Sequence, residues 1–248
     1  MSKEYNTENL SKDGRYIDEM NSIDALNFIL EDQLSVVLSI KKILPEISAV
    51  VEIMYQHIKN YPSGLLVYSG AGTSGRIGVQ DGTEIYPTFG WPKEKIKFII
   101  AGGSNAVFEA VEDAEDNLLA AKQSINDLNI SEKDIIIGIS ASGNTPFTSE
   151  ILRLSTNNNA LTIGISNNID TLLHKYSKHT ITVETGGEVV SGSTRLKAGT
   201  SQKIILNLIS TLLFTKLGFV KKGMMVNMTP TNDKLRKRKK LINKALNN

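Results

Sequence analysis

The sequence predicts an α/β protein with a doubly wound, five-stranded parallel sheet between two layers of helices. Five short apolar runs of strand length recur through the middle of the chain, and most of them are nearly continuously apolar. Parallel strands that are buried on both faces have this pattern. Segments with the apolar spacing of helices lie between the runs, as expected of successive βαβ units. With 40% hydrophobic and 22% charged residues, the composition is that of an ordinary globular protein.

Two helices are expected before the sheet. From Ser22 to Leu38, apolar residues recur at every third or fourth position, which predicts an amphipathic helix. Pro45 is expected to begin a second helix, because proline is favoured in the first helical turn. The turn-forming segment 61–64 ends it. We interpret 1–60 as an N-terminal helical arm, 61–220 as the sheet domain and 221–248 as a basic C-terminal helical tail.

The strands and the helices between them follow in order along the chain. The five apolar runs predict strands at 65–69, 96–101, 135–140, 161–166 and 180–183. Apolar spacing predicts helices at 106–126, 145–155 and 193–217, and a basic amphipathic helix from about Asn232. No internal repeat or low-complexity linker interrupts the pattern, so we expect one domain that carries a helical arm.

Composition excludes several classes of protein. No apolar run approaches the ~20 residues that a membrane-spanning helix needs, and the first residues lack the apolar stretch of a signal peptide. The chain has no cysteine, which excludes disulfides and thiolate metal sites. Its three histidines (His57, His174 and His179) are scattered. We therefore expect a cytoplasmic protein without a membrane partner or a metal site.

The C-terminal tail is strongly basic. Residues 234–248 carry seven of the 28 basic residues and no acidic residue. One interpretation is contact with nucleic acid or another anionic surface. The other is a solvated helix end, where cations interact favourably with the helix dipole. We favour the second interpretation, because the rest of the chain offers no basic surface that extends the patch.

The loop after the first strand is rich in glycine. Residues 70–75 read Gly-Ala-Gly-Thr-Ser-Gly, which formally matches the dinucleotide-binding fingerprint. That fingerprint also needs an acidic residue at the end of the second strand to hold the ribose. Here the second strand is followed by Gly102 and Gly103, and the next acid is Glu109. The sequence therefore disfavours binding of the dinucleotide NAD.

The loop after the third strand has the same character, reading Ser-Ala-Ser-Gly-Asn-Thr-Pro at 140–146. Two such loops present backbone N–H groups, hydroxyls and two helix N-termini, a combination that suits a phosphate monoester. The alternative is that these residues only cap helices and form turns. Neither loop has the Gly-Lys-Ser/Thr of a nucleotide triphosphatase. The candidate binding residues are Gly72, Thr73, Ser74, Gly75, Ser140, Ser142, Gly143, Asn144 and Thr145.

Two carboxylates near these loops are candidates for acid–base chemistry. Glu84 lies toward the end of the helix that follows the first loop, and Glu115 lies in an acid-rich segment after the second strand. Simple solvation is the alternative for every acid in that segment. Spacing alone does not distinguish Glu115 from its neighbours.

Several motifs are similar to those of the N-acetylmuramic acid 6-phosphate etherase family. They are Gly-Ala-Gly-Thr-Ser-Gly-Arg at 70–76, Ala-Gly-Gly at 101–103, Ala-Val-Glu-Asp-Ala-Glu-Asp at 110–116 and Ala-Ser-Gly-Asn-Thr-Pro at 141–146. The block 186–203 resembles a signature that these etherases share with the glucokinase regulatory protein, and 231–235 also matches. The resemblance runs in order from about residue 17 to residue 241.

This resemblance implies the SIS (sugar isomerase) fold, which binds phosphosugars, usually as a homodimer. It implies cleavage of the D-lactyl ether of N-acetylmuramate 6-phosphate, without a metal or organic cofactor, in cell-wall sugar salvage. By position, Glu84 matches the proton-donating glutamate of the family, and Glu115 matches its other catalytic acid. Thr73, Ser74, Ser142, Gly143 and Thr145 match its sugar-phosphate loops. Ser193 and Lys197, from the block 186–203, complete the set of candidate binding residues.

The chain departs from the family pattern in a few places. Asn144 stands where a cation is usual, Gly187 replaces a usual proline, and 7–9 lack the Arg-Asn that normally follows. The small C-terminal helical region of family members is also expected to be missing. Two alternatives therefore stay open: a non-catalytic phosphosugar sensor, and an aldose–ketose isomerase on the same fold. The isomerase does not account for the block 186–203.

Overall fold

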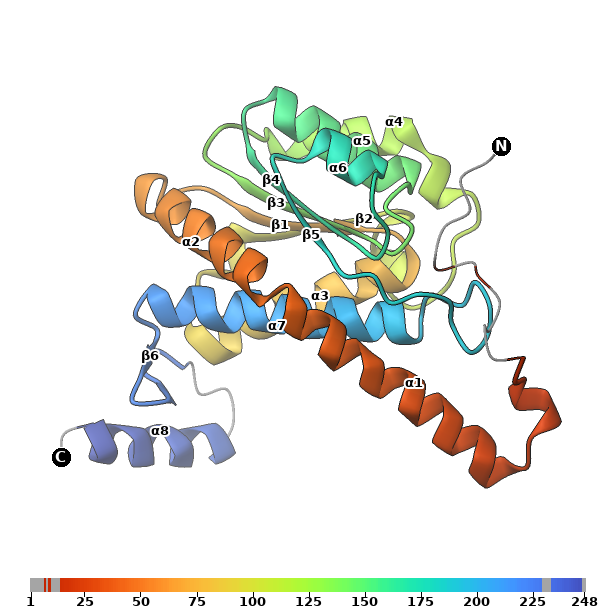
Figure 1. Ribbon diagram of the computed structural model, residues 1–248. Helices are drawn as coiled ribbons and strands as arrows, with labels where there is room; N and C mark the ends of the chain where they lie inside the picture. The colour runs from red at the N-terminus through yellow and green to blue at the C-terminus, as the bar shows by residue number, and fades with distance from the viewer. Residues whose placement is uncertain (1–6, 8, 10–13, 229–232, 247–248) are drawn as a thin grey trace.

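The computed structural model describes residues 7, 9, 14–228 and 233–246, and its centre is a five-stranded parallel sheet (Figure 1). The strand order is β2-β1-β3-β4-β5. Gly70, at the end of β1, lies opposite Ile100 of β2 and Ile139 of β3. The strands are β1 Leu66–Gly70, β2 Ile96–Ile100, β3 Ile135–Ser140, β4 Leu161–Ser166 and β5 His179–Thr182. The predicted fold class is confirmed.

Helices cover both faces of the sheet (Figure 1). One layer consists of α2 Leu44–Asn60, α3 Gly72–Phe89 and α7 Lys197–Lys216. The other consists of α4 Leu118–Leu128, α5 Pro146–Asn157 and α6 Leu172–Tyr176. Helix α1 (Ser22–Lys42) packs on α7 and then extends beyond the body of the molecule. Among the described residues, no helix is both long enough and apolar enough to cross a membrane.

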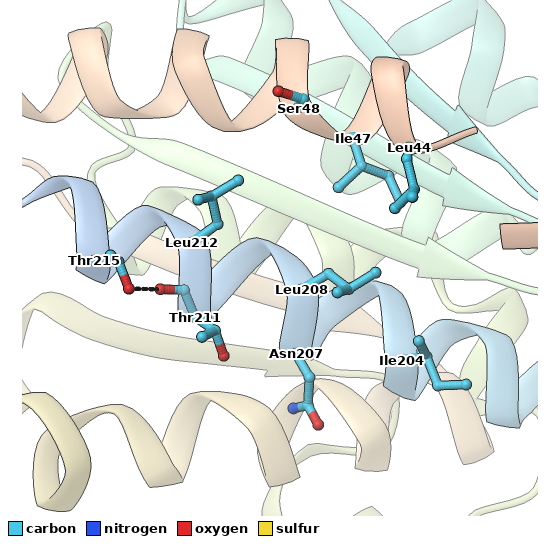
Figure 2. A pocket seen from close by; sticks show the side chains of 9 residues that line it. All are labelled: Leu44, Ile47, Ser48, Ile204, Asn207, Leu208, Thr211, Leu212 and Thr215. Atoms are coloured by element: carbon cyan, nitrogen blue, oxygen red, sulfur yellow. Dashed lines mark hydrogen bonds between the residues drawn. The ribbon is translucent and has the colours of Figure 1, made fainter. Parts of the chain in front are cut away.

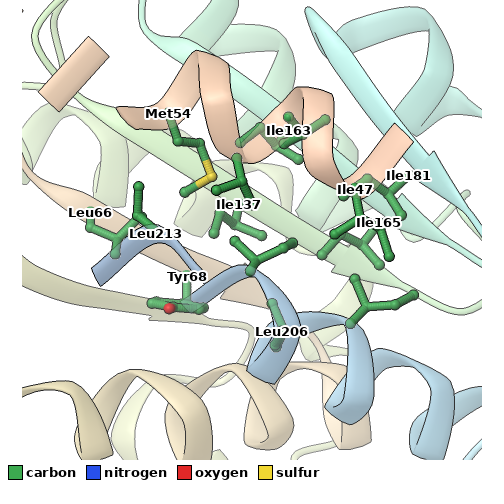
Figure 3. Packing of buried hydrophobic residues seen from close by; sticks show 14 of the residues in the cluster. Ile47, Met54, Leu66, Tyr68, Ile137, Ile163, Ile165, Ile181, Leu206 and Leu213 are labelled. Atoms are coloured by element: carbon green, nitrogen blue, oxygen red, sulfur yellow. The ribbon is translucent and has the colours of Figure 1, made fainter. Parts of the chain in front are cut away.

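The larger hydrophobic core lies between the sheet and the layer formed by α2, α3 and α7 (Figure 3). Met54 of α2 and Leu213 of α7 meet Ile137 and Ile163 of the central strands, and all four side chains are fully buried. Burial of each such side chain contributes roughly 1.5–3 kcal/mol. A strand made of consecutive isoleucines can bury both faces, so β3 also supplies Ile136 to the core on the opposite side.

The prediction of a continuous helix over 106–126 is wrong in its first half. The chain forms two short 3-10 helices, η4 Gly103–Val107 and η5 Ala114–Asp116, before α4 begins at Leu118. Arg76 donates hydrogen bonds to the carbonyl oxygens of Ala106 (2.9 Å) and Glu109 (2.8 Å). These carbonyl oxygens therefore bond to a side chain instead of to backbone N–H groups of a continuous helix. Asp113 adopts a left-handed conformation (φ 55°), which ends helical geometry. Glu115 therefore lies on η5, not on a long helix.

Helix α7 also begins later than predicted, at Lys197 instead of Ser193. The carboxylate of Glu188 accepts hydrogen bonds from the backbone N–H groups of Lys197 and Ala198, both at 3.0 Å. An acceptor at this position fixes the first turn of a helix. The short α6 and the hairpin of β6 Val220–Lys221 and β7 Met224–Met225 were not predicted, whereas α8 (Asp233–Leu246) begins where a basic helix was expected.

Candidate active site

The two glycine-rich loops meet at one edge of the sheet. They follow β1 and β3, which are neighbours in the sheet although β2 lies between them in sequence. The chain leaves β1 toward β2 on one side and continues from β3 toward β4 on the other. Open α/β sheets bind ligands at such a switch point, beyond the carboxyl ends of the strands.

The first loop brings backbone N–H groups to this edge. Helix α3 begins at Gly72 directly after β1, and the N–H groups of its first turn have no intrahelical acceptor. Gly75 lets the helix approach the strand closely, because a Cβ at this position would lie 2.8 Å from the carbonyl oxygen of Gly70. Thr73 and the buried Ser74 complete the turn. The positive end of the α3 dipole therefore faces the switch point.

The second loop forms a compact cluster of hydroxyl groups. The Ser140 hydroxyl lies 2.8 Å from that of Thr145 and 3.3 Å from that of Ser142, and it accepts a hydrogen bond from the Gly143 N–H. Gly143 has a φ of 73°, and a Cβ there would collide with the side chain of Thr171. This conformation of the loop therefore requires glycine at position 143.

Asn144 has a structural role that its sequence position does not reveal. Its amide oxygen accepts a hydrogen bond from the backbone N–H of Leu172 (2.9 Å), the first residue of α6. Its amide nitrogen donates to the carbonyl oxygen of Ser142 (3.2 Å). Asn144 therefore connects the second loop to α6. A lysine or arginine side chain could not accept the hydrogen bond from Leu172, because it has no acceptor atom.

Glu115 lies beside the first loop. A cavity of about 330 Å³ is lined by Gly72 and Thr73 on one side and by the segment that carries Glu115 on the other. Arg76 also lines this cavity, and its two hydrogen bonds to the 106–109 backbone hold that segment over the loop. The structure thus brings Glu115 and the predicted phosphate loop together.

Glu84 lies elsewhere. It is exposed on α3, in a separate pocket of about 170 Å³ between α3 and α7. It lies twelve positions after Gly72 on the helix, which corresponds to roughly 18 Å along the axis. This separation exceeds the length of one sugar ring and its phosphate group. Within one chain, Glu84 and Glu115 line separate pockets.

Comparison with known proteins identifies the family. An N-acetylmuramic acid 6-phosphate etherase of Mycoplasma mycoides is 38% identical over 240 residues, which are 97% of this chain and 79% of that protein. The etherase of Pasteurella multocida is 40% identical, with 95% and 78% covered, and that of Clostridium acetobutylicum is 42% identical, with 92% and 75% covered. The chain belongs to the N-acetylmuramic acid 6-phosphate etherase family. Residues 46–156 also match the model of the glucokinase regulatory protein N-terminal SIS domain.

Solved structures support the SIS fold of this etherase family member. A putative phosphosugar isomerase involved in capsule formation from Bacteroides fragilis superposes with a TM-score of 0.62, at 22% identity, over 82% of this chain and 95% of that one. The NanR protein of Vibrio vulnificus, complexed with ManNAc-6P, gives a TM-score of 0.57 at 11% identity, over 93% and 70%. At these identities the likeness concerns the fold alone.

Ser193 and Lys197, the other two candidate binding residues, lie just before α7 and at its first position. Ser193 lies in the turn before α7. The ammonium of Lys197 is buried and paired with Asp32 of α1 at 2.6 Å, while its backbone N–H bonds to Glu188. Burial raises the pKa of Glu188, although two backbone hydrogen bonds and Lys197 act in the opposite direction. In the isolated chain, Lys197 thus connects α7 to α1.

Arg76 is the site residue that sequence reasoning missed. It belongs to the first loop motif, and it is the first cation after β1. Its signal in the sequence is its place directly after the segment 70–75, which carries no charged side chain. Among the residues that the structure describes, no cluster of histidine, aspartate and glutamate is arranged to hold a metal ion.

Proposed function

We propose that this chain cleaves the D-lactyl ether of N-acetylmuramate 6-phosphate to N-acetylglucosamine 6-phosphate and D-lactate. The observation that carries the proposal is the similarity of about 40% identity to etherases over nearly the whole chain, with both Glu84 and Glu115 present. The neutral donors of the two loops support binding of the 6-phosphate at the switch point.

In the proposed mechanism the sugar reacts in its open-chain form. Glu115 removes the proton at C2, which is acidic because it is α to the C1 aldehyde. Glu84 protonates the ether oxygen as the C3–O bond breaks, and D-lactate leaves. Water then adds to C3 of the unsaturated aldehyde, and C2 regains a proton. One carboxyl must therefore be ionised and the other protonated when turnover begins.

We also propose that the active site is shared between two copies of the chain. The separation of Glu84 from the phosphate loop argues against a complete site within one copy. In a dimer with two-fold symmetry, Glu84 of each copy can instead lie over the loop of the other, which gives two identical sites.

An extensive apolar surface supports this homodimer. Helix α1 exposes a continuous stripe, whose members are 55% to 66% exposed: Ile23, Leu26, Leu30, Leu34, Val37 and Leu38. Next to it, α2 and α7 border an apolar groove of about 600 Å³ (Figure 2). Asn207 lines both this groove and the Glu84 pocket. A partner seated on the groove would thus lie beside Glu84, and monomers rarely expose so much contiguous apolar surface.

The shared site is tested by mixing two inactive variants. A dimer of one Glu84→Ala chain and one Glu115→Ala chain has one site with both substitutions and one intact site. When the two proteins are dissociated and reassociated in equal amounts, half of the dimers are mixed, so about a quarter of the wild-type rate is expected. If both glutamates acted within one chain, the mixture would stay inactive. Sedimentation equilibrium, run alongside, should give the mass of two chains.

The activity itself is tested by D-lactate release from N-acetylmuramate 6-phosphate, measured with an enzyme-coupled assay. Release by the wild-type chain is the expected result. If no lactate appears while the sugar phosphate still raises the melting temperature, the chain is a phosphosugar sensor. N-Acetylglucosamine 6-phosphate serves as a ligand control in both measurements.

Two further assignments accompany this function. We propose a cytoplasmic location, because a charged sugar phosphate does not cross a bilayer unaided. We retain the division into an arm (1–60), a phosphosugar-binding domain (61–220) and a basic tail (221–248). Within it, α2 of the arm also contributes Met54 and Val51 to the core of the sheet.

A further inference from the structure

The pocket that holds Glu84 contains a cation that the mechanism does not use. Its lining residues come from α3 and α7: Ile77, Gln80, Asp81, Glu84, Lys203 and Asn207. Of these six residues, Lys203 alone carries a positive charge. It is exposed at the mouth of the pocket, on the same side of α7 as Asn207 one turn later.

A chain of polar contacts fixes the position of this lysine. Asp81 is buried, and its carboxylate accepts hydrogen bonds from the Tyr68 hydroxyl (3.0 Å), the Asn207 amide nitrogen (2.6 Å) and the Ser210 hydroxyl (3.1 Å). Because Asp81 is an acceptor, the nitrogen of the Asn207 amide must face it. The amide oxygen then points away from Asp81 and accepts a hydrogen bond from the Lys203 ammonium.

Figure 2 shows the side chain of Asn207 pointing from α7 toward α3, and the same residue lines the Glu84 pocket between these two helices. Burial of the Asp81 carboxylate is unfavourable and raises its pKa. The three hydrogen bonds and the charge of Lys203 act in the opposite direction and lower this pKa. A buried carboxylate that is fully bonded rigidifies its surroundings. Only one of the three donor positions of the ammonium is used by Asn207, so two remain for a ligand.

The chemistry of the substrate suggests what those donors bind. If Glu84 protonates the ether oxygen, the lactyl group attached to that oxygen must lie in the same pocket. The lactyl group carries a carboxylate one carbon away from the ether oxygen. A substrate carboxylate next to Glu84 and Asp81 needs a cation to offset its charge. Lys203 supplies an ammonium in this pocket, and a hydrogen bond from an ammonium to a carboxylate is strengthened by the charges of both groups.

We propose that Lys203 binds the carboxylate of the lactyl group and so selects substrates that carry this group. Asp81 and Asn207 are positioning residues, which hold the ammonium in place without contacting the substrate. The inference rests on the proposed role of Glu84. It separates the substrate from the product N-acetylglucosamine 6-phosphate, which has the same phosphate and acetamido groups but no carboxylate for Lys203.

The test uses binding, so it does not depend on turnover. In a Glu115→Gln background, isothermal titration calorimetry gives the Kd of N-acetylmuramate 6-phosphate and of N-acetylglucosamine 6-phosphate. Replacing Lys203 with Met should raise the Kd of the first ligand about tenfold or more and leave the Kd of the second unchanged. Lys203→Arg keeps the charge and should restore part of the difference.

The matched control is Lys216→Met at the far end of α7, where the lysine pairs with Glu52. It should change neither Kd. Equal weakening of both ligands by Lys203→Met would overturn the proposal and assign Lys203 to the phosphate, and no weakening would overturn it outright. Failure of the proposed function is seen separately, as a wild-type chain that releases no lactate.

Discussion

Replacing Glu115 with Gln should lower the kcat of lactate release by a factor of about 10² to 10⁴, the usual contribution of a positioned general base. The substitution keeps the size of the side chain and its place on η5, and removes only the ability to take the C2 proton. Because Glu115 is exposed, the fold should not be affected. The measurement is the initial rate of D-lactate release at saturating substrate, with the melting temperature recorded for each protein.

The neighbouring Asp116→Asn is the matched control. Asp116 belongs to the same 3-10 helix but does not line the cavity beside the phosphate loop. We expect its rate to stay within about twofold of wild type, since an exposed carboxylate outside the site has little effect. A Glu115→Gln protein with wild-type kcat would remove Glu115 from the mechanism.

Replacing Phe214 with Ala should lower the free energy of unfolding by about 3–5 kcal/mol. Phe214 is fully buried on α7, where it stacks on Phe89 with a centroid distance of 4.9 Å. Trp91 and Phe219 contact it edge-on at 5.4 Å and 5.8 Å. Truncation leaves a cavity in the centre of this aromatic cluster, and rigid neighbours cannot fill it. Urea denaturation followed by tryptophan fluorescence measures the loss.

The same substitution at an exposed phenylalanine provides the comparison. Phe108 is 91% exposed after β2, so Phe108→Ala should change the free energy of unfolding by about 0.5 kcal/mol or less. A similar small loss at Phe214 would mean that the cluster collapses around the truncated side chain and does not hold α7 against the end of α3.

The strands could be predicted from the sequence because their information is local. Ile135–Ser140 and Leu161–Ser166 match the predicted ranges, since short, mainly apolar segments that are buried on both faces are typical of parallel strands. The loops after β1 and β3 could be placed for the same reason. Each follows a strand directly, so the sheet order brings them to one edge.

Other parts of the site depend on contacts between distant residues. The segment around Glu115 has helical spacing, yet the hydrogen bonds of Arg76 and the left-handed Asp113 make it two short 3-10 helices. The sequence placed Glu84 toward the end of the helix after the first loop, and helical rise then gives its distance from that loop. Its pocket between α3 and α7 could not be predicted, because it depends on how the two helices pack. The bond from Asn144 to α6 could not be foreseen, because that helix is only five residues long.

The two loops that we propose to bind the phosphate have a consequence for how the sugar is captured. Segments 70–75 and 140–146 contain hydroxyls, glycines and backbone donors but no lysine or arginine. Attraction between full charges acts over about a Debye length and weakens as salt is added, whereas hydrogen bonds from neutral donors act only at contact. Arg76 lines the cavity beside the first loop, but Glu112, Asp113 and Glu115 line it too. These charges offset one another, so encounter at the loops proceeds with little electrostatic steering. Recognition of the phosphate should accordingly remain nearly constant when the ionic strength around the protein changes.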